Sequence, residues 1–514
     1  MQLHTVSEAS FPWLTTIILL AVVSALVLWL VKPVRAHARP IALGLSLVIA
    51  AVYVVALVSE FDVTSAAGIQ IAETYSWIPQ IGVSLAWGIN GMGAVLIAMS
   101  VFLVPVVILA SWDEVEQDRI AGYLAWILFL EAIIIGLFAA RDLFVFYVLF
   151  EVMIIPIFFM IGRYGRGANR AKAAMKFLIY SLVGGLIMLV GVIAVYSYGP
   201  GGAGGFMIDN LATGLQISDG SQMWIFLSFF IAFAIKAPMW PVHTWLPDAT
   251  EEAPAGTSTL LVGILDKMGT FGMIAICLPL FPAAASDASG VIMILAVISI
   301  IWGAFMAIAS KNLMRLVAYT SVSHFGFMVL GIFSGSSIAM AGAILYMVAH
   351  GIGTAGLFLA VGFLGNRGKS HLISDYGGWQ RVTPIIAAFF MIAGLATISL
   401  PGLSGFVPEF MVLMGTYEVN APAALVAVIG VVLAAIYILL PYQRVFTGPR
   451  PETEAPVKDL GGREKTVMGV LVAAMLALGF FPAPALDAIN PVAEQSASHI
   501  DAGPADASAE GSSK

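Results

Sequence analysis

Residues 224–241 read Trp224-Ile-Phe-Leu-Ser-Phe-Phe-Ile-Ala-Phe-Ala-Ile-Lys236-Ala-Pro238-Met-Trp-Pro241, an apolar run that contains one lysine and is interrupted by two prolines. A lysine at the centre of a bilayer costs about 2.5–3.5 kcal/mol on insertion scales. Each proline removes a backbone hydrogen-bond donor and breaks a helix. A cation beside a broken membrane helix is typical of sites that move ions or protons.

The composition of the whole chain is that of a polytopic membrane protein. Of its 514 residues 60% are hydrophobic and 10% are charged, against about 25% charged in a soluble domain. The net charge of −7 includes no basic patch for nucleic acid. The single cysteine, Cys277, lies in an apolar run and excludes an internal disulfide, a CxxC zinc site and a cysteine-ligated iron–sulfur cluster.

The predicted fold is all-α, because fourteen apolar runs are long enough to cross a hydrocarbon core about 30 Å thick. The seventh and twelfth runs contain prolines. The runs lie near residues 13–31, 41–58, 91–111, 121–140, 142–162, 176–198, 223–243, 255–280, 291–309, 314–333, 338–364, 384–413, 421–446 and 466–486.

Lysines and arginines gather in alternate loops, which predicts the orientation of the chain. The positive-inside rule places these loops in the cytoplasm and both termini on the periplasmic side of a bacterial inner membrane. Positive charge follows the first run rather than preceding it, which favours a retained helix over a cleaved signal. The tail 494–514 is rich in Ala, Ser, Asp and Gly and is predicted to be disordered.

A second broken run resembles the first. It reads Leu400-Pro401-Gly-Leu-Ser-Gly405-Phe-Val-Pro408-Glu409-Phe and again places an ionisable residue at a break. Matching broken segments in two halves of a chain indicate inverted repeats with central ion sites. We therefore expect a three-helix segment (1–120), two five-helix repeats (121–280 and 281–446) broken near 238–241 and 401–408, and a final part (447–514) with an inner-side loop, the last helix and the tail. Simple proline kinks are the alternative.

Ionisable residues recur inside the predicted spans, where each is costly without a use. A buried lysine holds its proton while a carboxylate is near and releases it when the carboxylate withdraws, and histidine titrates near neutral pH. These residues suit proton transfer, although single ones could be structural partners, a boundary residue in the case of Asp266, or haem ligands in the case of the histidines. They are Glu131, Glu151, Lys236, Asp266, Lys267, His324, His350 and Glu409.

The stretch Ile235-Lys236-Ala-Pro-Met-Trp-Pro-Val-His243-Thr-Trp-Leu-Pro247-Asp248-Ala-Thr-Glu-Glu-Ala-Pro254-Ala-Gly-Thr-Ser258 resembles the antiporter-like subunits of respiratory complex I. The resemblance covers residues from about 80 to 450 and is strongest to the M-type (NuoM-type) subunit of proton-pumping NADH:quinone oxidoreductase. Glu409 stands where the L and N types are expected to carry lysine, the length is near 500, and no long lateral helix follows the last span.

The resemblance implies a role for six residues. Glu151 matches the glutamate of span five that partners the lysine of broken span seven, here Lys236. Lys267 matches the central lysine of span eight. His324 and His350 match the histidines of the central hydrophilic axis, and Glu409 matches the terminal residue of broken span twelve. Glu131 has no such match.

The resemblance also implies how the chain takes part in an enzyme. It would be a translocating subunit without a redox centre, metal or cofactor of its own, beside sister antiporter-like subunits and membrane lipid. NADH, FMN, iron–sulfur clusters and quinone would be bound by partner subunits. The alternatives are a subunit of an Mrp-type sodium/proton antiporter or of a membrane-bound hydrogenase, and a passive scaffold, against which the buried ionisable groups speak.

Overall fold

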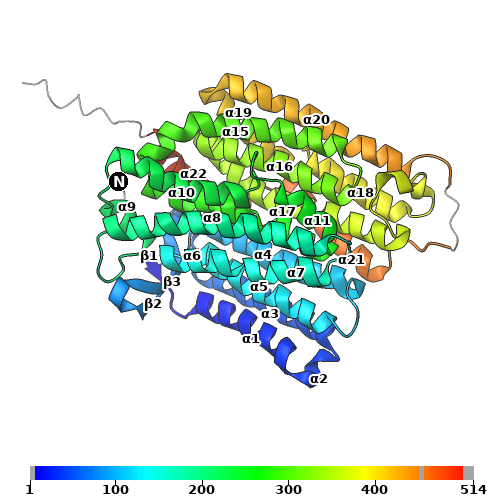
Figure 1. Cartoon of the computed structure of the whole chain (residues 1–514), viewed down its shortest axis with the longest axis horizontal. Helices are drawn as coiled ribbons and strands as arrows, with labels where there is room; N and C mark the ends of the chain where they lie inside the picture. Colours follow the sequence, from blue (N-terminus) through cyan, green and yellow to red (C-terminus); the bar gives the residue numbers. More distant parts are fainter. Residues whose placement is uncertain (1–5, 451–455, 502–514) are drawn as a thin grey trace, which may run out of the picture.

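The computed structural model describes residues 6–450 and 456–501, which form a bundle of long, roughly parallel helices (Figure 1). Helices that are apolar on all sides bury their backbone hydrogen bonds internally and so suit a bilayer. In the described part of the chain, eleven helical segments are long and apolar enough to cross a membrane. They are α1 (Trp13–Leu30), α3 (Ala38–Glu60), α4 (Gly91–Ala110), α5 (Ile120–Ala139), α6–α7 (Leu143–Val152 and Ile154–Tyr164), α8 (Arg170–Tyr198), α12–α14 (Ala255–Leu280), α15 (Pro282–Ala309), α16 (Leu313–Phe333), α17 (Ser337–Gly368) and α20 (Ala421–Phe446).

Helices break at both predicted places. α10 (Asp219–Lys236) ends before the prolines, and the next helix, α11 (Trp245–Glu252), is short. In the second half, α18 (Pro384–Thr397) and α19 (Phe406–Val419) are separated by an irregular segment. The polytopic helical fold is confirmed, whereas the count of fourteen spans and the inverted repeats stay predictions.

The last described segment differs from its prediction. α21 (Gly462–Phe480) is followed, after a bend of 63°, by α22 (Ala483–Asp501). The prediction of a disordered tail is therefore wrong for 494–501, and its remainder, 502–514, lies outside the described residues. Small and polar residues dominate 494–501, but Ile489, Val492 and Ile500 of α22 lie at helical spacing and are buried. Through this face α22 packs on α17 and α4.

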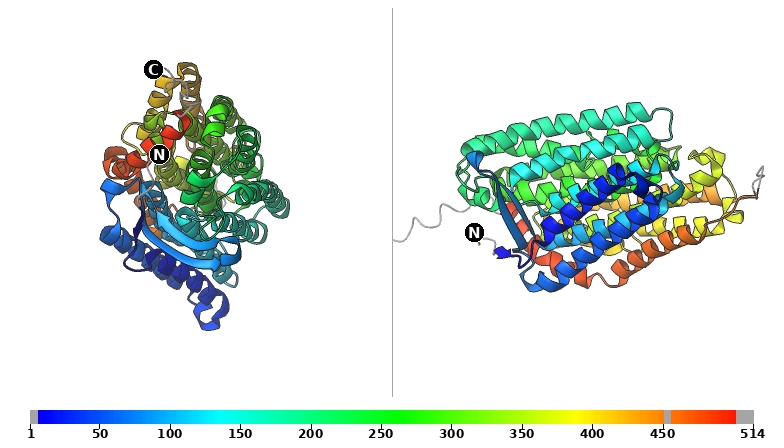
Figure 2. Two further views of the ribbon diagram at one scale, coloured as in Figure 1. Left: turned by 90° about the vertical axis from the view of Figure 1, so that its left-hand side faces the viewer. Right: turned by 90° about the horizontal axis from the view of Figure 1, so that it is seen from below.

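One end of the bundle carries a small sheet that the sequence analysis did not predict. Strands β1 (Val6–Glu8), β2 (Ile69–Ile78) and β3 (Val83–Ile89) follow that order, with β1–β2 parallel and β2–β3 an antiparallel hairpin. We call this the hairpin end; it also carries α9 (Ile208–Gly214), and Figure 2 (left) looks onto it.

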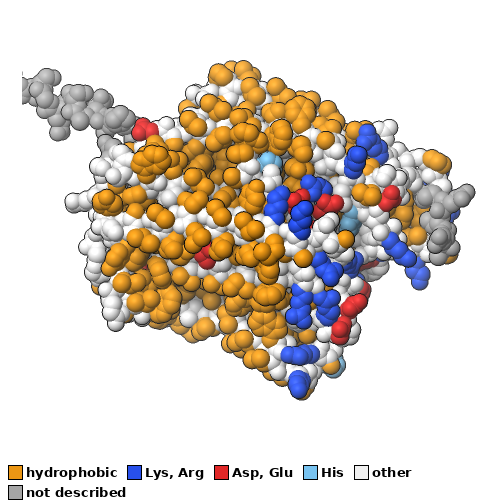
Figure 3. All heavy atoms as spheres, in the orientation of Figure 1, with side chains coloured by type: hydrophobic (Ala, Val, Ile, Leu, Met, Phe, Trp, Pro, Cys, Tyr) orange, Lys and Arg blue, Asp and Glu red, His pale blue; other side chains and the backbone are white. Residues whose placement is uncertain are grey.

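The opposite end, here called the basic end, holds the loops rich in lysine and arginine. Figure 3 shows blue side chains gathered toward this end and a broad orange surface over the rest of the same face. The apolar central stretches of the two central helices, α16 and α17, are completely buried within the protein, so the polar residues of these stretches face other helices rather than lipid.

Candidate functional site

Lys236 is positioned by the break in its helix. α10 ends at Lys236 because Pro238, two residues on, cannot continue the helix. The indole N–H of Trp245 donates to the carbonyl of Ile235 (2.9 Å), which satisfies one of the carbonyls left free at the helix end. Lys236 is the last residue of α10, and its side chain is 4% exposed.

The Lys236 ammonium is surrounded by one polar and two aromatic groups. Its Nζ donates to the hydroxyl of Ser181 on α8 (3.1 Å). The rings of Phe150 and Phe177 lie with their centroids 5.4 and 5.2 Å from Nζ, within cation–π range. One hydrogen bond and two ring faces stabilise the cation less completely than a carboxylate would.

The carboxylate of Glu151 lies near Lys236 without touching it. The two interact electrostatically, but no ion pair joins them in the part of the chain that the structure describes, and Glu151 Oε1 has no hydrogen-bond partner there. Glu151 packs instead on α8 at Gly185, where an added Cβ would lie 1.8 Å from Oε1. Gly185 and Ser181 are one turn apart on the same face of α8, so this helix places acid and base side by side in an open pair.

Lys267 occupies the centre of the bundle. Its side chain is fully buried between two π-helical turns, Leu261–Leu265 and Met273–Cys277, a distortion common at functional sites. Its Nζ donates to the carbonyl of Val262 (2.6 Å) and lies 2.7 Å from Nδ1 of His350 on α17.

Asp266 interacts electrostatically with both lysines, Lys236 and Lys267. It is 1% exposed, and its Oδ2 has no hydrogen-bond partner among the described residues. The interpretation of Asp266 as a boundary residue is therefore wrong, because it lies inside the bundle.

The two histidines predicted for the axis are in contact. The rings of His350 and His324 lie 5.2 Å apart at 80°, and Nε2 of His324 is 3.0 Å from the hydroxyl of Tyr437 on α20. The ring of Tyr346 lies 5.7 Å from that of His324. Because the histidine rings touch each other, no space remains between them for a haem plane, which removes the haem alternative.

Glu409 ends this series of contacts. It lies in the first turn of α19, and its Oε2 accepts hydrogen bonds from the hydroxyls of Tyr346 (2.6 Å) and Ser399 (2.8 Å). The Ser399 hydroxyl comes from the irregular segment between α18 and α19. The helix break in the second half of the chain therefore supplies a hydrogen-bond donor to Glu409, as the break after α10 positions Lys236.

The side chains from Lys267 to Glu409 thus form an almost continuous series of contacts, whereas Glu151 and Lys236 are not in contact. From Lys267 the contacts run through His350, His324 and Tyr346 to Glu409. A cavity of about 10 Å³, lined by His324, Tyr346 and His350, adjoins them and is about the size of one water. Glu131, by contrast, is fully buried on α5, and neither carboxylate oxygen has a hydrogen-bond partner among the described residues.

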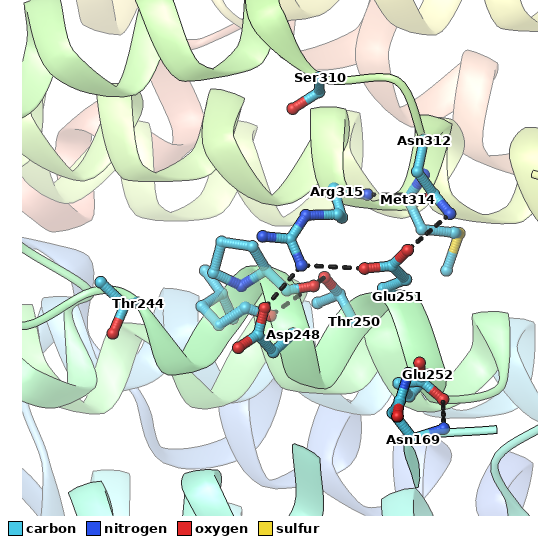
Figure 4. Close-up of polar contacts among 12 residues, drawn as sticks. Asn169, Thr244, Asp248, Thr250, Glu251, Glu252, Ser310, Asn312, Met314 and Arg315 are labelled. Atoms are coloured by element: carbon cyan, nitrogen blue, oxygen red, sulfur yellow. Dashed lines mark hydrogen bonds and ion pairs between the residues drawn. The ribbon is translucent and has the colours of Figure 1, made fainter. Parts of the chain in front are cut away.

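A charged cluster toward the basic end joins α11, which follows the break after Lys236, to α16 (Figure 4). Asp248 on α11 forms ion pairs with Lys176 (2.7 Å) and Arg315 (2.6 Å), and Arg315 also pairs with Glu251 (2.9 Å), which accepts from Asn312. Burial raises the pKa of Asp248, but the hydrogen bonds and charges of Lys176 and Arg315 outweigh burial and hold that pKa below its usual range. The conspicuous stretch after Lys236 is therefore fixed to α16 by charge.

Two tyrosines that contact the axis, Tyr346 and Tyr437, were not predicted from the sequence. Tyr346 precedes His350 by four residues, so its position on the same helix face was a usable signal. Tyr437 comes from α20, and nothing in its local sequence pointed to His324. Among the described residues, no three His, Cys, Asp or Glu side chains are grouped as metal ligands would be.

Comparisons with known proteins agree on a family. Residues 140–435 match the model of the family described as "NADH:quinone oxidoreductase/Mrp antiporter, TM". NADH-quinone oxidoreductase subunit M of Mycobacterium tuberculosis is 40% identical over 524 residues, covering 95% of this chain and 94% of that protein.

Solved structures give the same result. A chain of respiratory complex I from Thermus thermophilus with bound NADH is 34% identical, with a TM-score of 0.85, and 95% of this chain and 99% of that one are covered. A chain of the Mrp complex from Dietzia shares the fold (TM-score 0.82, covering 95% of this chain and 99% of that one) at 20% identity. The chain belongs to the NADH:quinone oxidoreductase/Mrp antiporter family, and within it to subunit M of the NADH-quinone oxidoreductases.

Proposed function

We propose that this chain transfers protons across the membrane as a subunit of an NADH:quinone oxidoreductase, driven by quinone reduction elsewhere in the complex. The observation that carries the proposal is the buried series of contacts from Lys267 to Glu409, preceded by the open pair of Glu151 and Lys236. Such groups are costly inside a membrane unless they are used.

The first half acts as the switch. When the Glu151 carboxylate approaches Lys236, it stabilises the ammonium, and when it withdraws to its place beside Gly185, the ammonium keeps only Ser181 and two ring faces. Lys236 then releases its proton toward Lys267, and the Asp266 carboxylate, which interacts with both lysines, stabilises the positive charge on the way.

The second half acts as the relay. Lys267 passes a proton to Nδ1 of His350 across 2.7 Å. A water in the adjoining cavity connects His350 and His324 to the hydroxyl of Tyr346, because all three residues line the cavity and His350 Nε2 lacks a hydrogen-bond partner among the described residues. Tyr346 accepts a proton as it gives its own to Glu409, from which the proton leaves the protein.

The setting follows from the same proposal. The basic end lies in the cytoplasm and the hairpin end, with both termini, in the periplasm of a bacterium. Other membrane subunits of complex I, including sister antiporter-like subunits, cover part of the apolar surface. NADH, FMN, iron–sulfur clusters and quinone are bound by partner subunits, and this chain responds to them through conformation or charge.

The experiment compares wild type with Lys236→Ala in inverted membrane vesicles at equal amounts of assembled complex. We expect loss of both NADH-driven quinone reduction and proton uptake. Unchanged activity in the assembled variant would refute the proposal and favour the Mrp-type alternative, for which a sodium-dependent proton-exchange assay is the measurement.

A further inference from the structure

Two cavities at the hairpin end meet at Arg141. The first, about 280 Å³, lies among β1, β2 and the chain before α1, and its lining includes Glu8, Glu73 and Arg141. The second, about 90 Å³, lies deeper and is lined by Arg141 and Asp209 at one side and by Phe138 and Phe271 at the other. Each has room for several waters, since one water needs about 10–15 Å³ by this kind of measure. Arg141 thus lines both cavities and lies where they meet.

Arg141 has the properties of a gate residue. It is the only lysine or arginine at the hairpin end within residues 6–450 and 456–501. It is 8% exposed, pairs with Asp209 of α9 at 2.8 Å, and its Nε has no hydrogen-bond partner among those residues. A guanidinium in a narrow passage repels cations, and a partner carboxylate cancels that barrier while the two are paired.

The inner cavity ends close to the axis. Phe138 of α5 and Phe271 of α13 (Lys267–Gly272) stack edge to face with centroids 5.1 Å apart and form its inner wall. Phe271 follows Lys267 by four residues, about 6 Å of helix. Phe138 follows Glu131 by seven residues, about 10 Å of helix and the same face. Lys267 and Glu131, whose carboxylate has no hydrogen-bond partner among the described residues, therefore lie one and two turns further along the helices that carry these two rings.

We propose that the first repeat contains its own proton route to the hairpin end, gated by Arg141 and Asp209 and closed by Phe138 and Phe271, with Lys267 and Glu131 at its inner end. The inference rests on the proposed function and adds to it, since the exit proposed above runs through Glu409 in the other half. Movement of the two rings would admit water to Lys267 without passing through the histidines. Protons could thus leave at two places.

Cysteine accessibility tests this route, because the chain has a single cysteine. Cys277 is buried and is replaced by alanine, and Ala275→Cys then places a thiol on the wall of the inner cavity. The matched control is Ile276→Cys, at the same depth but fully buried and outside the cavity lining. Small membrane-impermeant thiosulfonates, one anionic and one cationic, are added to the assembled complex in oriented vesicles, and modification of this chain is followed by mass.

We expect Ala275→Cys to react from the hairpin side about tenfold or more faster than Ile276→Cys, because a thiol reacts only where it is accessible. Arg141→Met should raise the rate with the cationic reagent relative to the anionic one, because it removes the guanidinium and leaves the carboxylates of Asp209, Glu8 and Glu73 at the passage. Proton uptake per NADH should fall in Ala275→Cys after modification, compared with the same variant before it.

Equal rates at the two positions, or reaction from the basic end only, would overturn the route. Modification without any fall in proton uptake per NADH would show a cavity that leads nowhere and would overturn it equally. Lys236→Ala is measured in the same vesicles: normal pumping there refutes the proposed function, whereas its loss together with an inaccessible Ala275→Cys refutes only the second route.

Discussion

Replacing Gly185 by alanine should displace the Glu151 carboxylate directly. The added Cβ would lie 1.8 Å from Oε1 and 2.3 Å from Cδ, whereas real Cβ contacts are essentially never shorter than 3.0 Å. Widening the gap from 1.8 to 3.0 Å moves the carboxylate away from α8 by about 1.2 Å. Misplacement of a reacting group by about 1 Å can cost up to a hundredfold in rate. We therefore expect NADH-driven proton uptake to fall about ten- to a hundredfold.

The assay uses inverted vesicles that contain equal amounts of assembled complex, with quinone reduction and proton uptake measured together. Gly184→Ala is the matched control, because its Cβ would meet the flexible end of Ile235 at 3.1 Å and otherwise make ordinary contacts at 3.5 Å or more. Adding Glu151→Asp to Gly185→Ala should restore part of the activity, because aspartate is shorter by one carbon–carbon bond, about 1.5 Å. If Gly185→Ala pumps like wild type, or if Gly184→Ala is equally damaging, the position of Glu151 against α8 does not control proton transfer.

Two other changes test the relay and the charged cluster. Tyr346→Phe removes the donor 2.6 Å from Glu409; since such a bond contributes about 1.5–3 kcal/mol, proton uptake should slow at least about tenfold, and a rate equal to wild type would exclude the tyrosine from the relay. Arg315→Gln removes one of the charges that hold the pKa of Asp248 below its usual range. A carboxyl with a depressed pKa contributes stability at higher pH and loses it as the pH falls through the folded-state pKa, so the variant should inactivate at a higher pH on acidification than wild type. Activity after incubation between about pH 7 and about pH 4 measures this, and identical curves would contradict it.

Features that depend on covalent chemistry could be predicted from the sequence. Both helix breaks could be predicted, because proline cannot donate a backbone hydrogen bond wherever it lies in a fold. The hairpin β2–β3 also has a sequence signal, since Ile69–Ile78 is rich in β-branched and aromatic residues, but at ten residues this segment is too short and too polar to count as a membrane span. In α22, helical spacing of a few apolar residues outweighed a composition typical of disorder.

The geometry of the site depended on tertiary packing and was only partly predictable. Its ionisable residues could be named because such groups are rare in membrane spans, and the resemblance to the family implied roles for six of them. Whether Glu151 of α6 touches Lys236 of α10 depends on how these two helices are rotated on α8, against which both pack, and no local pattern specifies that. The contact of Tyr437 with His324 joins positions 113 residues apart in the sequence, and Asp266 interacts with Lys236 because α10 and α13 pack together.

The ion pairs of Arg315 have a mechanical consequence. Arg315 lies in the first turn of α16, and His324 lies on the same uninterrupted helix, nine residues or about 13 Å further along. Through Asp248 and Glu251 the first turn of α16 is bound to α11, the short helix that follows the break beside Lys236. A helix resists compression and bending, so a displacement of α11 when Lys236 gains or loses its counter-charge would shift α16 as a rigid rod. The distance between His324 and His350 would then change in step with the state of Lys236, although no proton has yet passed between them.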